Sequence, residues 1–277
     1  YGIHGIHGRA PTIATGIATA RPDLSVWVIT GDGDGLSIGG NHLIHALRRN
    51  VNLKILLFNN QIYGLTKGQY SPTSEEGKVT KSTPFGSVDH PFNPIALALG
   101  AEGTFVARTL DNDRQHLTQV LRQAAQHRGA AFVEIYQNCN VFNDGAFDVL
   151  REKPRGAHNQ IRLEDGQPIV FDDGNRCVRV GDNGRLEIGS TAETDPDRIV
   201  VHDVQGRPSL AFALAHLAPG PTEPTCIGVF REDERPVYGE AMTSQLERAV
   251  ERLGPGDLHG LLYGGDTWTV AADEATG

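Results

Sequence analysis

Two polar motifs, each placed directly after a short apolar run, constrain the fold of this chain more than any other feature. The first motif is Gly31-Asp32-Gly33-Asp34-Gly35, which follows the apolar run at residues 25–30. The second is Asn59-Asn60, which follows the apolar run at residues 53–58. Apolar runs of this length that end in turn residues are typical of buried parallel strands. We therefore predict both motifs at the carboxyl ends of neighbouring strands, where open α/β sheets bind their ligands.

The residue types at these strand ends suit a divalent cation that is shared with a diphosphate. Asp32 offers a charged oxygen ligand, and Asn60 offers a neutral one after the next strand. Mg²⁺ prefers hard oxygen ligands of this kind and often takes others from phosphate groups. Glycines beside the ligands allow the backbone to approach phosphate oxygens closely or to adopt a positive φ.

Two other interpretations of the first motif stay open. A dinucleotide-binding fingerprint needs G-x-G-x-x-G, but Ile38 stands where the third glycine belongs. A glycine-rich turn between a strand and a helix, with no ligand at all, is the second possibility. The Asn-Asn pair at the end of the next strand favours the cation and diphosphate over both.

Alternating strands and helices indicate an α/β fold in the first half of the chain. Further elements are expected as helices at residues 12–20, 41–50, 94–99 and 113–127, and as strands at residues 104–107 and 131–136. We predict a doubly wound parallel sheet within residues 1–150, with its last strand at residues 131–136. Residues 64–94 form a long polar loop, of the kind that is usually functional. Residues 151–277 are expected to form a C-terminal extension of turns, hairpins and helices, with helices at residues 207–218 and 237–253.

Composition narrows the possible partners and the compartment. The 277 residues carry a net charge of −9 with acids and bases interspersed, and no basic block predicts nucleic-acid binding. The apolar runs are strand-sized, so we expect no membrane span. The three cysteines, Cys139, Cys177 and Cys226, include no C-x-x-C pair and suit a reducing compartment, the cytoplasm.

Four segments resemble, in the same order, the beta subunits of 2-oxoacid:ferredoxin oxidoreductases, and most closely those that use 2-oxoglutarate. They are HGIHGRA at residues 4–10, GDGDGLSIGG at 31–40, YGLTKGQYSPTS at 63–74 and TKSTPFG at 80–86. The resemblance covers residues 1–147 and implies the pyrophosphate-binding module of the thiamine diphosphate fold. It implies the CoA-dependent oxidative decarboxylation of a 2-oxoacid, here 2-oxoglutarate to succinyl-CoA. It also implies thiamine diphosphate, Mg²⁺ and a [4Fe–4S] cluster that passes electrons to ferredoxin.

The same resemblance assigns roles to individual residues. It gives Mg²⁺ to Asp32, Asn60 and the backbone carbonyl of Ile62. It assigns contacts with the cofactor to six residues: His7, Gly31, Gly33, Asp34, Gly64 and Leu65. Lys67 and its neighbour Thr66 are the candidate catalytic residues, with Lys67 pairing with a substrate carboxylate; a solvated loop lysine is an equally compatible interpretation.

Cys139 resembles the fourth cysteine ligand of the cluster, and the other three ligands would lie outside this chain. A buried structural thiol is the alternative for Cys139, and no role is predicted for Cys177 or Cys226. The family pattern begins before Tyr1, which implies an N-terminal piece that is missing from this sequence.

The resemblance also implies that this chain does not work alone. No glutamate here matches the family's activating glutamate, which we expect from an alpha subunit that carries the pyrimidine-binding half. Two other functions remain possible for such a chain: a non-oxidative thiamine diphosphate decarboxylase or carboligase, and a non-catalytic scaffold of the same fold. The presence of both Asp32 and Asn60 argues against the scaffold.

Overall fold

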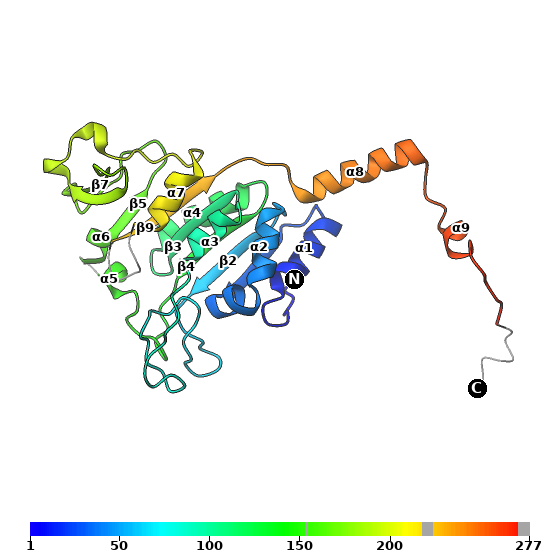
Figure 1. Ribbon diagram of the computed structural model, residues 1–277, viewed down its shortest axis with the longest axis horizontal. Coiled ribbons are helices and arrows are strands. Elements are labelled where there is room, and N and C mark those ends of the chain that lie inside the picture. Colours follow the sequence, from blue (N-terminus) through cyan, green and yellow to red (C-terminus); the bar gives the residue numbers. More distant parts are fainter. Residues whose placement is uncertain (153–154, 218–223, 271–277) are drawn as a thin grey trace. The chain divides into compact units, whose positions relative to one another are not determined.

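The centre of the fold is a six-stranded sheet with the order β1-β2-β4-β3-β9-β5 (Figure 1). The computed structural model describes residues 1–152, 155–217 and 224–270. The strands of the sheet are β1 (Trp27–Gly31), β2 (Lys54–Asn59), β3 (Phe105–Leu110), β4 (Ala131–Tyr136), β5 (Gln160–Leu163) and β9 (Thr225–Glu232). All neighbouring strands run parallel except β3 and β9, which pair antiparallel. The predicted α/β class and the mostly parallel sheet are confirmed.

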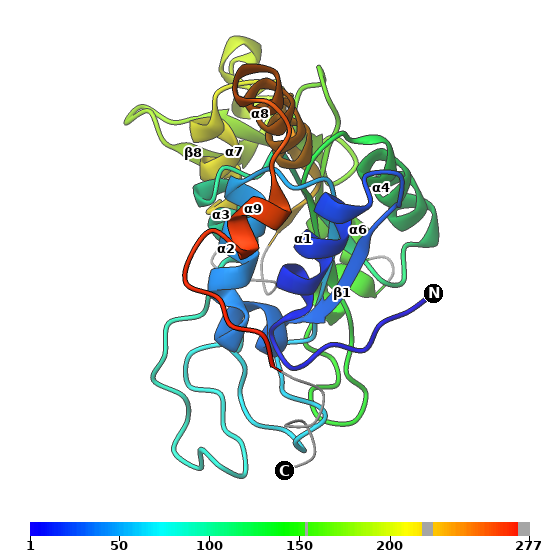
Figure 2. The same ribbon diagram turned by 90° about the vertical axis from the view of Figure 1, so that its right-hand side faces the viewer.

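Helices cover both faces of this sheet (Figures 1 and 2). One face carries α1 (Ala10–Ala20), α2 (Gly40–Arg48), α3 (Pro94–Gly100) and α7 (Pro208–Ala215), and the other carries α4 (Arg114–Gln126). Side chains of a strand alternate between the two faces. Ile55 and Leu57 of β2 therefore pack in the first core, while Leu56 packs in the core beneath α4.

The sheet does not end with β4, so the expectation that residues 131–136 form its last strand is wrong. β9 adds to the outer edge of β3, and the register shifts between Val106 and Ala107. Gly228 follows the shift as the partner of Arg108; it has a φ of 121°, and a Cβ there would come within 2.7 Å of the carbonyl oxygen of Leu163 in β5. The positive φ and the close approach to β5 require glycine at this position. Residues beyond 150 thus supply two of the six strands, β5 and β9.

A small second sheet and further helices lie outside the main sheet and the helices that cover it. A second, antiparallel sheet joins β6 (Val170–Phe171), β7 (Arg176–Val180) and β8 (Leu186–Ser190), which agrees with the predicted hairpins. The remaining elements are α5 (Asp148–Arg151), α6 (Arg155–Asn159), α8 (Tyr238–Leu253), α9 (Leu258–Leu262) and the 3₁₀ turns Thr191–Glu193 and Pro196–Arg198.

The chain forms two compact units, Tyr1–Gly239 and Glu240–Gly277. We keep the boundary at residue 150 as a proposal for the extent of the cofactor-binding module. Residue 218 of the helix predicted at 207–218 and residues 271–277 lie outside the described residues. No helix in the described ranges is both long enough and apolar enough to cross a bilayer.

His127 should make the stability of the fold depend on pH. Its buried ring lies 2.9 Å from the Thr104 hydroxyl, and burial together with the charge of Lys54 lowers the pKa of His127 from 6.5 to about 4. Below pH 6.5 the unfolded chain binds a proton that the folded chain does not. Stability should therefore fall between pH 6.5 and pH 4, by up to about 3 kcal/mol. Urea titrations at pH 7 and pH 5 should show a smaller loss for His127→Gln than for the wild type; an equal loss would contradict this assignment.

Candidate active site

The two polar motifs meet at one edge of the sheet. β1 ends at Gly31 and β2 at Asn59, and the two strands pair in parallel with Gly31 opposite Phe58. The chain leaves β1 through Asp32 and a π-helical turn, Asp34–Ile38, that leads into α2. Asp32 and Asn60 therefore follow neighbouring strands at the same edge, as the sequence predicts.

Asp32 is a buried carboxylate held by hydroxyl groups. Only 2% of the residue is exposed, and its Oδ2 atom accepts hydrogen bonds from Ser71 Oγ at 2.5 Å and Thr73 Oγ1 at 2.8 Å. Burial raises the pKa of Asp32, while these two hydroxyls and the Asn60 backbone N–H act in the opposite direction. A desolvated carboxylate is costly unless a cation or further hydrogen bonds compensate it. The chemistry of Asp32 therefore fits a cation ligand.

The Asn60 turn adds neutral oxygens. The Asn60 side-chain oxygen accepts from the Ile62 N–H at 3.2 Å, which fixes the turn. Ile62 is 3% exposed, and no group in the described part of the chain donates a hydrogen bond to its carbonyl. The described residues contain no cluster of three or more His, Cys, Asp or Glu that could hold a metal. One carboxylate, one amide and one carbonyl fit Mg²⁺ that takes further oxygens from a diphosphate.

Asp34 connects the first motif to the His-Gly turn near the amino terminus. Its Oδ1 atom accepts from the Gly8 N–H at 2.6 Å and lies 2.7 Å from His7 Nδ1, and its Oδ2 atom accepts from Thr30 Oγ1 at 2.5 Å. Both oxygens of Asp34 are thus occupied by protein groups. This arrangement orients the ring of His7, whose side chain is 58% exposed.

Close packing explains one glycine of the first motif. A Cβ on Gly33 would lie 2.2 Å from the ring of Tyr63, whose hydroxyl donates to the Gly33 carbonyl at 3.0 Å. Gly31 and Gly33 do not have positive φ, so the expected left-handed backbone is not the reason for glycine at either position. No atom lies within 4 Å of a Cβ built on Gly64, which leaves space beside the Asn60 turn.

The candidate catalytic residues lie on an exposed turn that Tyr63 and Gln69 close. Lys67 has a φ of 75°, a left-handed conformation that is uncommon for lysine and that often marks functional loops. Its ammonium group forms no hydrogen bond or ion pair within the described ranges. Leu65 is 97% exposed, whereas the Thr66 hydroxyl is hydrogen-bonded to the Gln69 side chain. The turn therefore presents Leu65 and Lys67 outward.

Cys139 lies in the turn after β4, close to the Asn60 backbone. Asn143 donates its backbone N–H to the Cys139 carbonyl at 2.9 Å and its side-chain amide to the Asn60 carbonyl at 2.9 Å. Cys139 is half-buried, whereas Cys177 and Cys226 are buried in strands. Burial raises the pKa of Cys226 to about 12, so its thiol is unreactive near neutral pH.

Sequence reasoning missed a buried polar network behind the Asn-Asn turn. The Asn59 amide donates to Glu134 at 2.8 Å, and Arg108 Nε donates to the other oxygen of Glu134 at 2.7 Å. Thr73 Oγ1 lies 2.9 Å from the Asn59 side-chain oxygen. The signal that could have revealed it is a charged residue inside each of two otherwise apolar strands, Arg108 in β3 and Glu134 in β4.

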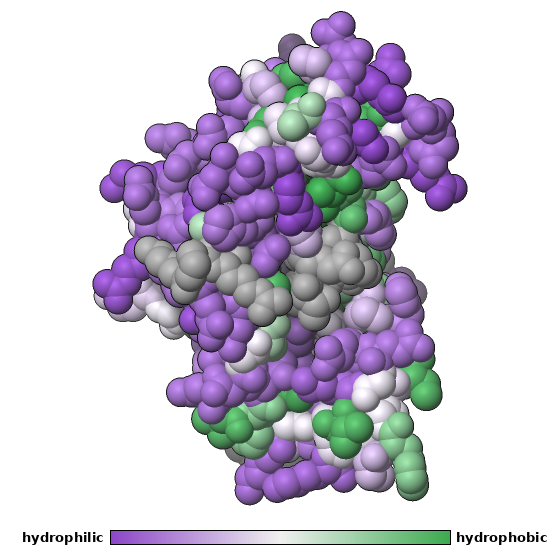
Figure 3. Space-filling model, turned by 90° about the vertical axis from the view of Figure 1, so that its left-hand side faces the viewer, coloured by the Kyte–Doolittle hydropathy of each residue, from purple (hydrophilic) through white to green (hydrophobic). Residues whose placement is uncertain are grey.

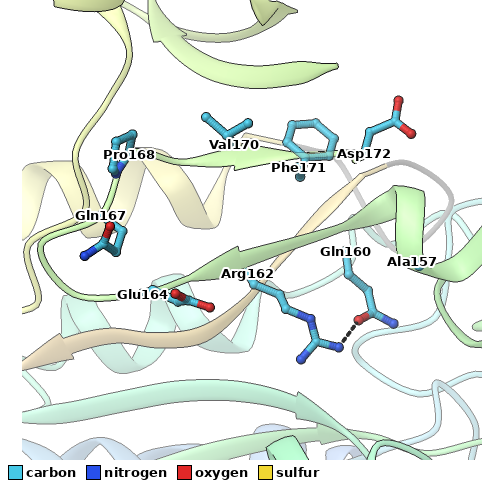
Figure 4. Close-up of a pocket in the computed structure, with 9 residues that line it drawn as sticks. All are labelled: Ala157, Gln160, Arg162, Glu164, Gln167, Pro168, Val170, Phe171 and Asp172. Carbon is cyan, nitrogen blue, oxygen red and sulfur yellow. Dashed lines mark hydrogen bonds between the residues drawn. The ribbon is translucent and has the colours of Figure 1, made fainter. Parts of the chain in front are cut away.

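Two cavities lie in the first unit. The larger, of about 930 Å³, is lined by Arg108 and Glu134 of this network and by aromatic residues that include Phe92 and Phe212. The smaller, of about 260 Å³, lies between β5 and β6 and is lined by residues between Ala157 and Asp172 (Figure 4). The smaller cavity contains none of the candidate site residues.

Comparisons with known proteins agree with this geometry. Residues 1–135 match the family of thiamine pyrophosphate enzymes, C-terminal TPP-binding domain. The chain is 61% identical over 275 residues to the 2-oxoglutarate oxidoreductase subunit KorB of Mycobacterium tuberculosis, covering 98% of this chain and 73% of that protein. It is 48% identical over 143 residues to the 2-oxoacid:ferredoxin oxidoreductase subunit beta of Saccharolobus solfataricus, covering 52% of this chain and 47% of that relative.

A solved structure extends the similarity to the fold. The 2-oxoglutarate:ferredoxin oxidoreductase from Magnetococcus marinus, with 2-oxoglutarate, coenzyme A and succinyl-CoA bound, superimposes with a TM-score of 0.71 and 30% identity. The match covers 96% of this chain and 76% of that chain. The fold and the strand-end site define a thiamine diphosphate-binding domain. The chain belongs to the beta subunits of the 2-oxoglutarate:ferredoxin oxidoreductases.

Proposed function

We propose that this chain is the beta subunit of an enzyme that converts 2-oxoglutarate and coenzyme A to succinyl-CoA and passes the electrons to ferredoxin. The observation that carries the proposal is the buried Asp32 carboxylate beside the Asn60 turn, in a chain 61% identical to a 2-oxoglutarate oxidoreductase subunit. The reaction named for that relative is oxidative, which favours this function over a non-oxidative decarboxylase. The described site has a buried carboxylate and nearby amide and carbonyl oxygens that would suit a metal, which a non-catalytic scaffold would not need.

The strand-end residues would hold the diphosphate. Thiamine diphosphate, when bound, supplies the carbanion and the electron sink that decarboxylation of a 2-oxoacid requires. Asp32, Asn60 and the Ile62 carbonyl would hold Mg²⁺ together with the diphosphate oxygens. His7, oriented by Asp34, would contact the diphosphate. Gly31, Gly33, Gly64 and Leu65 complete the proposed surface around the cofactor.

Cys139 would contribute one thiolate to a [4Fe–4S] cluster. Its turn is fastened to Asn60 through Asn143, which would keep such a cluster near the cofactor. The remaining thiolates would come from outside the sequence described here. The free thiols and the ferredoxin-linked reaction favour a cytoplasmic location.

An exposed apolar rim near the site supports a partner subunit. Large hydrophobic side chains are strongly exposed in the loop at residues 64–94 and in the turn after β4. They include Leu65, Phe85, Val88 and Val141. Figure 3 shows several hydrophobic residues among hydrophilic ones in the lower part of the view, and Figure 1 places the loop that follows β2 at the lower end. Large apolar side chains that are exposed close together often belong to protein interfaces. An alpha subunit that brings the pyrimidine-binding half and the activating glutamate would cover this rim.

The function is tested by an anaerobic assay of the purified complex with coenzyme A, a viologen acceptor and a 2-oxoacid. We expect acceptor reduction with 2-oxoglutarate that depends on coenzyme A and on both subunits. Decarboxylation without any acceptor reduction would instead support the non-oxidative alternative. A complex with neither activity and no affinity for thiamine diphosphate would support the scaffold.

Lys67 should determine which 2-oxoacid is used. The distal carboxylate of 2-oxoglutarate, which pyruvate lacks, could pair with the free ammonium of Lys67. A charge-assisted hydrogen bond of this kind contributes on the order of 1.5–3 kcal/mol, or about tenfold to a hundredfold in preference. In the same assay, Lys67→Ala should lower kcat/KM for 2-oxoglutarate far more than for pyruvate. Lys81→Ala, further along the same loop, is the control; an equal loss for both substrates would mean that Lys67 binds a group they share.

A further inference from the structure

Both side-chain hydroxyls that hold the Asp32 carboxylate donate to the same oxygen atom. Ser71 and Thr73 both donate to Oδ2, although they follow Asp32 by 39 and 41 positions in the chain. The three residues are each no more than 3% exposed. No side chain in the described part of the protein donates to the other oxygen, Oδ1. Rotation of the carboxylate is therefore restricted by two hydroxyls of the long loop.

The Ser71 hydroxyl is anchored to the turn that carries the second metal ligand. The Ser71 backbone N–H donates to Ser74 Oγ at 2.8 Å, and Ser74 Oγ donates to the Gln61 carbonyl at 2.6 Å. Gln61 directly follows Asn60. The contact between Ser71 and Asp32 therefore ties the first motif to the second through the loop.

The Thr73 hydroxyl is anchored to the interior of the sheet. Because the Asn59 amide nitrogen donates to Glu134, the Asn59 oxygen is the atom that faces Thr73 at 2.9 Å. Thr73 Oγ1 thus lies between two acceptors, Asp32 Oδ2 and Asn59 Oδ1. Arg108 in turn fixes Glu134 at 2.7 Å. The position of the Thr73 hydroxyl is set by a buried network and not by solvent.

Groups that hydrogen-bond to a metal ligand orient it, and their removal typically weakens metal binding by about 10- to 100-fold. We propose that Ser71 and Thr73 are positioning residues that set the Mg²⁺ affinity of this site by fixing the Asp32 carboxylate. The inference rests on the proposed function, because it takes Asp32 to be a magnesium ligand. Neither hydroxyl needs to touch the ion or the cofactor.

The test measures thiamine diphosphate binding by calorimetry at a series of Mg²⁺ concentrations, using the full-length subunit assembled with its partner. Ser71→Ala and Thr73→Val should each raise the Mg²⁺ concentration for half-maximal cofactor binding by about 10- to 100-fold. Saturating Mg²⁺ should restore the binding stoichiometry. Thr73→Ser, which keeps the hydroxyl, should remain close to the wild type.

A matched control exists in the same loop. The hydroxyls of Thr80 and Ser82 lie 3.2 Å from each other and do not contact Asp32. The double variant Thr80→Val/Ser82→Ala should leave the Mg²⁺ dependence unchanged.

Two results would overturn the inference. One is a wild-type Mg²⁺ dependence in both Ser71→Ala and Thr73→Val. The other is an equal loss in Thr73→Ser and Thr73→Val, which would show that the shape of the side chain matters and its hydroxyl does not. If the wild-type complex binds the cofactor without any need for Mg²⁺, the proposed magnesium site fails and the inference fails with it, whereas the anaerobic assay tests the proposed reaction separately.

Discussion

Replacing Asp32 with alanine should abolish the magnesium-dependent part of thiamine diphosphate binding. Asp32 is the one carboxylate of the proposed ligand set, so its removal leaves two neutral oxygens to hold a divalent cation. We expect a fall in cofactor affinity beyond the roughly 100-fold that the loss of an orienting neighbour can cause. Calorimetry with and without Mg²⁺ measures the effect directly. Unchanged cofactor affinity would exclude Asp32 as a ligand.

Asp32→Asn separates the loss of the ligand from the loss of the fold. Burial raises the pKa of Asp32, so the ionised side chain opposes folding near neutral pH when no cation is present. The neutral amide keeps the shape and can still accept hydrogen bonds from Ser71 and Thr73. We expect this variant to bind cofactor poorly and yet to be at least as stable as the wild type without cofactor. A large drop in its unfolding temperature would attribute the binding defect to misfolding.

The largest loss of stability should come from breaking the buried ion pair between Arg108 and Glu134. The side chains are 5% and 0% exposed, and they meet at 2.7 Å. Glu134→Gln would leave the guanidinium buried without its counter-charge, which typically costs about 3–5 kcal/mol. The new amide would also face the Asn59 amide nitrogen, donor against donor. Urea titration of the wild type and of Glu134→Gln measures the difference in their free energies of unfolding.

A double variant tests whether the uncompensated charge is the cause. Arg108→Met/Glu134→Gln removes the cation as well, and similar apolar replacements of buried pairs are often nearly neutral. It should therefore recover at least half of the stability lost in Glu134→Gln alone. The single variants Glu134→Gln and Arg108→Met are measured as well. If the double variant loses as much stability as the two single variants together, Glu134 does not stabilise the fold by neutralising Arg108.

The strands around the site could be predicted because each is a short apolar run that stops at turn residues. β9 could not be recognised in the same way, because Gly228 interrupts its apolar run and strands rarely contain glycine. The structure shows that this glycine has a positive φ and lies directly against the backbone of Leu163 in β5. The place of β9 in the sheet depends on its pairing with β3, about 120 residues earlier in the chain. A local sequence pattern carries no information about such a distant partner.

The residues of the site likewise fall into those that local sequence predicts and those that only long-range contacts reveal. Asp32 and Asn60 could be found because their position relative to the strands is local in sequence. Ser71 and Thr73 could not, since the loop that carries them has neither helical nor strand periodicity and their contacts with Asp32 are long-range. The sequence shows Asn59 as half of the Asn-Asn motif. Its contact with Glu134 depends on the register between β2 and β4, which the sequence does not show.

The antiparallel pairing of β9 with β3 has a consequence for synthesis of the chain on the ribosome. Arg108 of β3 lies opposite Gly228 of β9, so the outer edge of β3 stays open until some 120 further residues have emerged. At about 5–20 residues per second, that interval is roughly 6–24 s. An open edge next to buried strands can pair with other nascent chains. A chain truncated after β4 would keep this edge open permanently.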